Sequence, residues 1–233
     1  MVKKRKSAPK KLLSLNEQYD AALGEIWLNG IETNPRGLHC KEILNHKFEI
    51  DPNDNVVTLK GWETNVDYAR LELLWYKAVT NRIDFDSVIK KTWEQFSDDG
   101  ITVNSAYGWR LFGGHPGIGI NQWNWVLKKF EEDPDSRQCV MNLNSAFDKF
   151  NSTKDFVCTI AIHAIIREGK LYWTVYMRSQ DLYLGTRNDI YCFTELQKMM
   201  AEQVGVRLGT YTHICTSLHL YDTELDKLDR EIR

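Results

Sequence analysis

The cysteines of this sequence are its strongest candidate nucleophiles, and their spacing limits what they can do. They are odd in number, widely separated and contain no C-x-x-C pair. This spacing argues against both a disulfide framework and a zinc site, because each brings cysteines together in sets. We therefore expect free thiols, a reduced cytoplasmic protein and no metal. The five are Cys40, Cys139, Cys158, Cys192 and Cys215.

Cys158 stands out among them because it lies at the entrance of a predicted β-hairpin. Two β-branched and aromatic runs within residues 156–184 flank Glu168 and Gly169, a dipeptide typical of a hairpin turn. Alternation along the first run would hold the thiol on one face of a rigid strand. An inert buried cysteine is the more common case, and the hairpin alone does not exclude it. The residues predicted to share this face are Ile160, Ile162, Ala164 and Ile166.

The first elements of the chain follow from capping and turn signals. Ser14 and Glu17 have the spacing of a capping box, and apolar residues then recur at helical intervals up to Gly30. Residues 48–59 predict a strand, a turn rich in aspartate and asparagine, and a second strand. These elements are structural in character.

Two helices are predicted next. One is capped near Thr64 and carries Glu72 beside its apolar face; the other covers residues 84–96 and contains Trp93. A lone glutamate on a helix is usually a surface charge, and a lone tryptophan usually packs in a core. The apolar face of the first helix is expected to contain Leu71, Leu74, Trp75 and Ala78.

The second half of the chain shows helices and strands with clear boundary signals. A glycine-rich stretch at residues 113–119 lacks both common phosphate-loop patterns, so we interpret it as a turn. The predicted elements are a helix from Asn121 to Asp133, a strand over residues 139–143, the hairpin, a helix capped by Asn188 and ended by Gly205, a strand over residues 210–221 and a polar C-terminal tail.

Length and charge favour a single domain. The 233 residues are 42% apolar, which is enough for one core, and a formal charge of −2 gives no reason to expect a nucleic-acid partner. No apolar run approaches the roughly 20 residues of a membrane span. We expect a disordered basic tail over residues 1–12 and one catalytic domain over residues 13–233. A non-catalytic nucleotide or RNA binder that uses this tail is an alternative.

Six motifs together resemble the thymidylate synthase superfamily and, within it, the phage deoxycytidylate hydroxymethylases. The resemblance covers roughly residues 30–222. It implies an α+β fold with a mixed β-sheet flanked by helices, in a homodimer packed through the sheet. The motifs are E-L-L-W-Y at residues 72–76, Y-G-W-R at 107–110, D-P-D-S-R-Q at 133–138, R-S-Q-D at 178–181, R-N-D at 187–189 and S-L-H-L-Y at 217–221.

The chemistry that the resemblance implies begins at a thiolate. Addition of the thiolate to C6 of a pyrimidine makes C5 nucleophilic toward a one-carbon unit. Cys158 would be this nucleophile, with Tyr107 close to it and the cationic Arg178 lowering its pKa. Glu72 would order water and relay protons. Trp93 would lie over the co-substrate, 5,10-methylenetetrahydrofolate.

The resemblance also implies a phosphate site shared between two subunits. Arg36, Arg178 and Ser179 would bind the nucleotide phosphate through guanidinium and hydroxyl donors. Arg137 would reach the same phosphate from the partner subunit. Asp181 would brace the arginines.

Sugar and base contacts are implied at the end of the chain. His219 and Tyr221 stand two apart on a predicted strand, hence on one face, and match the family pair that bonds the sugar hydroxyl. Asp189 stands where enzymes acting on deoxyuridylate carry asparagine. An aspartate accepts from the cytosine amino group and, when protonated, donates to N3, so deoxycytidylate is the expected substrate.

Three other positions depart from the synthase pattern. Gln138 replaces a second phosphate arginine, Thr159 replaces the histidine after the nucleophile, and Ser217 replaces an aspartate. The last two fit the hydroxymethylase branch, in a host cytoplasm if the protein is phage-encoded. The expected reaction converts deoxycytidylate, methylenetetrahydrofolate and water to 5-hydroxymethyl-deoxycytidylate and tetrahydrofolate. A reductive C5-methyltransferase and a ribonucleotide (CMP) hydroxymethylase on the same scaffold are alternatives.

Overall fold

The computed structural model describes residues 11–146, 148 and 154–232. The basic tail expected over residues 1–12 therefore lies almost entirely outside the described residues. Residues 11–14 have no regular secondary structure and lead directly into the first helix.

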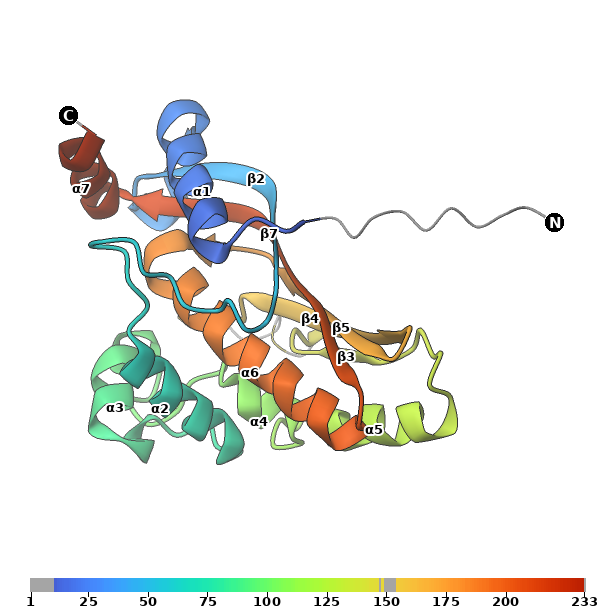
Figure 1. Ribbon diagram of the computed structural model, residues 1–233. Coiled ribbons are helices and arrows are strands. Elements are labelled where there is room, and N and C mark those ends of the chain that lie inside the picture. Colours follow the sequence, from blue (N-terminus) through green and yellow to red (C-terminus); the bar gives the residue numbers. More distant parts are fainter. Residues whose placement is uncertain (1–10, 147, 149–153, 233) are drawn as a thin grey trace.

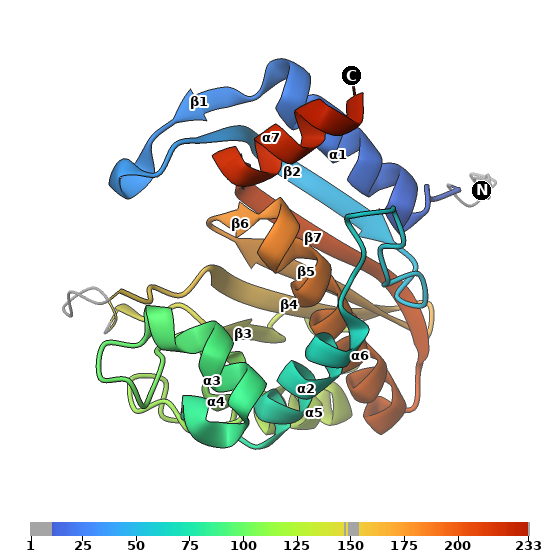
Figure 2. The ribbon, with the colours of Figure 1, turned by 90° about the vertical axis from the view of Figure 1, so that its left-hand side faces the viewer.

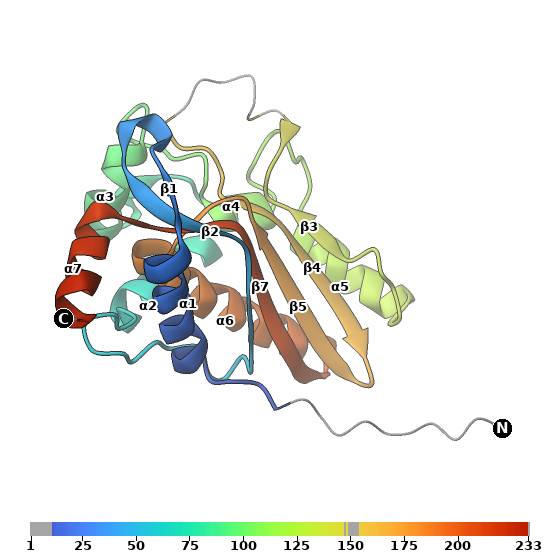
Figure 3. The ribbon, with the colours of Figure 1, turned by 90° about the horizontal axis from the view of Figure 1, so that it is seen from above.

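A seven-stranded mixed sheet forms the centre of the fold (Figures 1 and 3). Its strands are hydrogen-bonded in the order β1-β2-β7-β5-β4-β3, and the short β6 pairs with β7. β5 and β7 are parallel, whereas β2 with β7 and β4 with β5 are antiparallel. The expected α+β class and mixed sheet are confirmed. The strands are β1 (Ile31–Thr33), β2 (Cys40–Ile50), β3 (Val140–Asn142), β4 (Thr159–Arg167), β5 (Lys170–Met177), β6 (Gln180–Asp181) and β7 (Arg207–Tyr221).

Helix α6 (Arg187–Val204) lies along one face of this sheet (Figure 1). It contacts β5 and β7 as well as α2 (Val66–Lys77) and α5 (Gln122–Glu132), so it links the sheet to the helical layer. Figure 2 shows α1 (Leu15–Asn29) beside α7 (Asp222–Ile232), and both pack against β2. The remaining α-helices are α3 (Ser87–Trp93) and α4 (Tyr107–Leu111).

Elements with strong local signals lie where the sequence predicts them. The capping box of Ser14 and Glu17 is complete at the start of α1, and Asn121 caps α5. Glu168 and Gly169 have φ of 52° and 68°, the left-handed geometry that a two-residue hairpin turn requires. Gly205, at φ 75°, ends α6.

The second strand predicted within residues 48–59 is wrong. β2 ends at Ile50, and the backbone after the turn bonds to side chains and to nearby backbone groups instead of to a strand partner. Thr64 Oγ1 accepts from Val57 N at 3.0 Å, and Asn16 Oδ1 accepts from Thr58 N at 2.8 Å. Backbone groups bonded in this way need no sheet edge.

The predicted inner face of α2 is also partly wrong. Leu74 is 57% exposed and Ala78 is exposed, whereas Glu72 is buried. Asn65, not Thr64, caps this helix. Because the buried face is rotated by about one residue, the acidic side chain points into the protein and Leu74 faces outward.

Three further boundaries differ from the prediction. Helix 84–96 is α3 with a single 3₁₀ turn on either side. Asn188 does not cap α6, since a π-helical turn over Leu182–Thr186 leads into the helix and places Asn188 in its first turn. The polar tail folds as α7, in which Leu225 and Leu228 are buried one turn apart among charged residues.

Candidate active site

Cys158 and Arg178 lie together where the hairpin strands begin and end. Arg178 N donates to Cys158 O at 2.9 Å, which extends the pairing of β4 and β5 by one step. The guanidinium donates through Nε to Val157 O at 3.0 Å and through Nη2 to Phe156 O at 2.7 Å. Its Nη2 lies 3.6 Å from Cys158 Sγ. The loop that carries the thiol therefore also fixes the cation beside it.

A β-bulge separates the thiol from the face that the sequence predicts. The register of β4 against β5 shifts between Thr159 and Ala161. As a result Thr159 is fully buried while Ile160 is 41% exposed, and the buried face resumes at Ile162. One extra residue reverses the alternation, so Cys158 does not share the core face of Ile162 and the residues that follow.

The pKa of Cys158 is raised, contrary to the expectation from its cationic neighbour. Burial disfavours the thiolate most strongly, and the carboxyl groups of Asp189 and Asp155 act in the same direction. Arg178 and, more weakly, Arg36 lower the pKa without reversing this balance.

Two buried carboxyl groups come from the helices α6 and α2. Asp189, in the first turn of α6, accepts from Gln180 Nε2 at 2.7 Å, and burial raises its pKa to about 7. Glu72 on α2 accepts from Asn188 Nδ2. Burial and the nearby charge of Asp189 raise the pKa of Glu72 well above its usual value. Each carboxyl is thus a candidate proton carrier near neutral pH.

Sequence reasoning missed both amide partners of these carboxyl groups. Gln180 is only 3% exposed, and its side chain comes from β6. Asn188 has the sequence signal of a helix cap, which hides its role as a partner of Glu72. The signal that could have found them is position, because each amide stands next to a predicted site residue, in R-S-Q-D and R-N-D.

Aromatic side chains line the same region. Tyr107, at the start of α4, stacks on Phe193 with ring centroids 5.4 Å apart. Burial raises the pKa of Tyr107, and Asp189 and Cys158 raise it further. Trp93, half-buried at the end of α3, donates from Nε1 to Tyr68 Oη at 3.1 Å. Its neighbour across the cluster is the Trp75 ring, at 5.5 Å.

The predicted phosphate and sugar residues meet around the end of β7. Arg36 lies exposed at φ 57°, and its guanidinium lowers the pKa of Tyr221 against the larger effect of burial, which raises it. The rings of His219 and Tyr221 are 5.1 Å apart and nearly perpendicular. Burial lowers the pKa of His219, and its Nδ1 has no partner among the described residues. Ser217 donates to Glu42 on β2.

Three of the predicted residues have other surroundings. Asp181 Oδ1 accepts from Tyr183 N and Leu184 N at 2.8 and 2.9 Å, so it begins the π-helical turn; no hydrogen bond to Arg36 or Arg178 is found among the described residues. Ser179 is half-buried between Arg178 and β6. Arg137 is exposed, and its side chain has no bonded partner in the described part of the chain, so its contact with a partner subunit stays a prediction.

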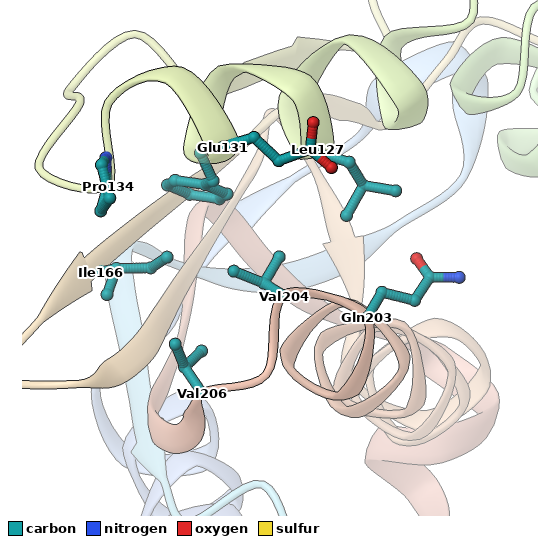
Figure 4. Close-up of a pocket in the computed structure, with 8 residues that line it drawn as sticks. Leu127, Glu131, Pro134, Ile166, Gln203, Val204 and Val206 are labelled. Carbon is teal, nitrogen blue, oxygen red and sulfur yellow. The ribbon is translucent and has the colours of Figure 1, made fainter.

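An apolar hollow of about 380 Å³ lies elsewhere, between α5, β4 and the end of α6 (Figure 4). None of the predicted site residues lines it. Its lining includes Phe130, Ile166, Val204 and Val206. Of the helices in the described ranges, none is long and apolar enough to cross a membrane.

Comparison with known proteins gives relatives that are similar in sequence and in fold. Two phage proteins, each named deoxyuridylate hydroxymethyltransferase, are similar in sequence. The one from Bacillus phage SP01 is 36% identical over 201 residues, and the one from Delftia phage PhiW-14 is 30% identical over 205 residues. The alignments cover 80% and 82% of this chain but 52% and 56% of the relatives. The chain therefore spans about half the length of these curated relatives.

More distant relatives are covered more fully. Thymidylate synthase of Bacillus mojavensis is 24% identical over 236 residues, which are 93% of this chain and 83% of that protein. The solved structure of thermostable thymidylate synthase A from Bacillus subtilis has a similar fold, with a TM-score of 0.77 and 24% identity over 95% of this chain and 84% of that one. The sequence model of the family described as thymidylate synthase matches residues 17–233. The chain belongs to the thymidylate synthase family.

Proposed function

We propose that this protein is a folate-dependent one-carbon transferase that hydroxymethylates deoxycytidylate at C5. The reaction consumes deoxycytidylate, 5,10-methylenetetrahydrofolate and water, and it yields 5-hydroxymethyl-deoxycytidylate and tetrahydrofolate. The observation that carries the proposal is Asp189, a buried carboxyl with a pKa of about 7 that stands near the Cys158 thiol. A carboxyl of this kind can hold a proton at neutral pH and still accept a hydrogen bond.

Asp189 suits the Watson–Crick edge of cytosine. Cytosine offers an amino donor at N4 and an acceptor at N3, so its partner must accept at one atom and donate at the next. A protonated carboxyl does both. Burial keeps the carboxyl protonated up to about pH 7.

Cys158 would carry out the covalent step. Its thiolate adds to C6 of the base, C5 gains the one-carbon unit and loses its proton, and the bond from Sγ to C6 breaks when product forms. Burial raises the pKa of the free thiol, so Arg178, 3.6 Å from Sγ, is the group that stabilises the thiolate as it forms. Glu72 carries a proton that can be exchanged with the water that supplies the hydroxyl group.

The aromatic cluster fits a folate. Trp93 exposes part of an indole ring that Tyr68 and Trp75 hold in place, which suits stacking with a pterin. When bound, the folate supplies a one-carbon unit at the oxidation level of formaldehyde. Burial, and then the nearby charge of Glu72, raise the pKa of Tyr68, the hydrogen-bond partner of Trp93.

The nucleotide would be held at its other end by charge and by a second subunit. Arg36, Arg178 and Ser179 would bind the phosphate, and His219 with Tyr221 would bind the sugar hydroxyl. Arg137, whose side chain is exposed and unpartnered among the described residues, would complete the phosphate site of a partner in a homodimer.

A second candidate is hydroxymethylation of deoxyuridylate. It is favoured by the names of the two phage relatives, which both act on that nucleotide by name. Asp189 could serve uracil only with its proton on the other carboxyl oxygen, since uracil reverses the donor and acceptor of the edge.

Product mass tests the proposal. Purified protein is incubated with methylenetetrahydrofolate and, separately, deoxycytidylate, deoxyuridylate or the ribonucleotide CMP. We expect deoxycytidylate to gain CH₂O faster than the other nucleotides react. A gain of CH₂ would indicate reductive methylation, and preferential turnover of deoxyuridylate or CMP would reject the proposed substrate. Cys158→Ala is the control for turnover by a contaminant.

A further inference from the structure

Gln180 is a buried amide, and the stability of the fold does not explain why an amide stands there. Its side chain is 3% exposed, and Nε2 donates to Asp189 Oδ2 at 2.7 Å. The other end, Oε1, has no partner among the described residues. A buried carbonyl without a donor destabilises a fold, so an apolar side chain of the same size would be the more stable choice. What the amide does achieve is contact with Asp189.

This contact breaks the symmetry of the Asp189 carboxyl. A protonated carboxyl has two equivalent arrangements, with the proton on either oxygen. An N–H that points at Oδ2 favours lone pairs there and therefore places the proton on Oδ1. The carboxyl then presents its donor and its acceptor in a fixed order.

A fixed order matters because cytosine and uracil differ in the order of the same two groups. Cytosine has an acceptor at N3 and a donor on C4, and uracil has a donor at N3 and an acceptor on C4. When the sugar and phosphate hold the base in one orientation, a carboxyl with a mobile proton can match both bases. A carboxyl with a fixed proton can match only one.

We propose that Gln180 is a positioning residue that fixes the Asp189 proton on one oxygen and thereby makes the site discriminate between amino- and oxo-pyrimidine nucleotides. This inference rests on the proposed function, because it takes Asp189 as the residue that reads the base. It does not depend on which of the two bases the wild-type protein prefers.

Gly185 provides the space that the amide needs. A Cβ placed on Gly185 would lie 2.8 Å from Gln180 Nε2 and 3.6 Å from Asp189 Oδ2. The backbone of this glycine is not left-handed, so its role is to leave room and not to allow an unusual φ. Any larger residue here would displace the amide before it touched the carboxyl.

The test is Gln180→Met, which keeps the length of the side chain and removes the donor. kcat/KM is measured for deoxycytidylate and deoxyuridylate with the wild type and the variant. We expect the preference between the two nucleotides to fall about tenfold or more toward equality, because the less favoured base gains a matched carboxyl. Gly185→Ala should shift the preference in the same direction by displacing the amide.

Gln197→Met is the matched control. Gln197 is also fully buried, and its Oε1 likewise has no partner among the described residues, but its Nε2 donates to two backbone carbonyl groups, Leu171 O at 2.9 Å and Gly209 O at 3.1 Å, and not to a predicted site residue. It should lose stability in a thermal melt and keep the nucleotide preference of the wild type. This separates a general packing defect from the effect of freeing the proton.

The pH dependence of kcat/KM is a second measurement, and a change in packing alone would not alter it. The hydrogen bond from Gln180 lowers the pKa of Asp189 against the larger effect of burial, so its loss should move the titration above about pH 7. The other titratable groups that respond to Asp189 have their own pKa raised: Glu72, Tyr76, Tyr107, Cys158, Cys192, Tyr211 and Cys215.

The outcomes distinguish this inference from the proposed function. An unchanged nucleotide preference in both folded Gln180→Met and folded Gly185→Ala would overturn the role of Gln180 and leave the function standing. A wild-type preference for deoxyuridylate that Gln180→Met relaxes would reject the proposed substrate and support the role of Gln180.

Discussion

At the base end of the candidate site, Asp189 and Glu72 are buried, and each accepts a hydrogen bond from a neighbouring amide. At the phosphate end, Arg36 and Arg178 are exposed, and Arg36 lies in a left-handed turn. Burial at the base end raises the pKa of both carboxyl groups, so under the proposed function the order of hydrogen-bond donor and acceptor would select the base there. The phosphate end would rely on charge that solvent screens until the nucleotide binds. Selectivity and affinity would then arise in separate places.

Removing the thiol between the two ends should have the largest effect. Cys158→Ala should abolish turnover, because it removes the thiol proposed to add to C6, and should leave nucleotide binding intact, since the proposed phosphate and sugar contacts do not involve Sγ. Product formation is followed by mass spectrometry and binding by calorimetry. Turnover by a clean preparation of the variant would refute the covalent mechanism.

Asp189→Asn tests the base end alone. The amide keeps the shape but matches uracil at both atoms and cytosine at one. Each mismatch of buried polar groups costs about 1–3 kcal/mol, so kcat/KM should fall for deoxycytidylate and rise for deoxyuridylate, a change in ratio of one to several powers of ten. The contribution of the nucleotide phosphate to binding should not change. If the ratio stays constant, the base is selected by another residue.

Arg137→Ala tests whether the phosphate end is completed across a dimer. The variant should bind nucleotide more weakly and have a higher KM, because one charge-assisted contact is gone. When it is mixed with Cys158→Ala, about a quarter of all pockets should become complete, since half of the dimers are mixed and each restores one pocket of two. Activity that fails to recover on mixing would place Arg137 outside the partner's site.

The smallest effect is expected from pH. Burial raises the pKa of Asp189 to about 7, so the protonated carboxyl that matches cytosine is lost as pH rises above that value. Deoxycytidylate affinity should be insensitive to this group below about pH 7 and fall about tenfold per unit above it. Calorimetry on Cys158→Ala avoids the titration of the thiol. Adding Asp189→Asn to this variant should remove the dependence of affinity on pH. If the affinity of Cys158→Ala already does not depend on pH, binding does not require a proton on the Asp189 carboxyl.

Features with local causes could be predicted from the sequence. The capping box at Ser14, the cap at Asn121 and the hairpin turn at Gly169 each involve residues a few positions apart, and all three are confirmed. The family resemblance added the α+β fold, which is confirmed as well. It also supplied the site residues, whose roles remain predictions.

Features that depend on distant contacts could not be read from local patterns. Glu72 reads as a surface charge until Asn188, 116 positions later, donates to it in the core. The bulge at Thr159 has no sequence signal, because β-branched residues continue on both sides of it. α7 has a weak sequence signal, since among its described side chains only Leu225 and Leu228 are buried apolar residues.

The pairing of β2 with β7 has a consequence for synthesis. Cys40 lies opposite Tyr221, so β2, near the start of the chain, must wait for β7, the last strand along the described chain. Such long-range pairings make folding slow, because a large loop closes before its contacts form. A chain emerging from the ribosome would already carry Cys158 and Arg178 while β2 still exposed an unpaired edge. In the nascent chain β2 would therefore stay without its β7 partner until residues 207–221 had been made, and His219 and Tyr221 would join the candidate site only then.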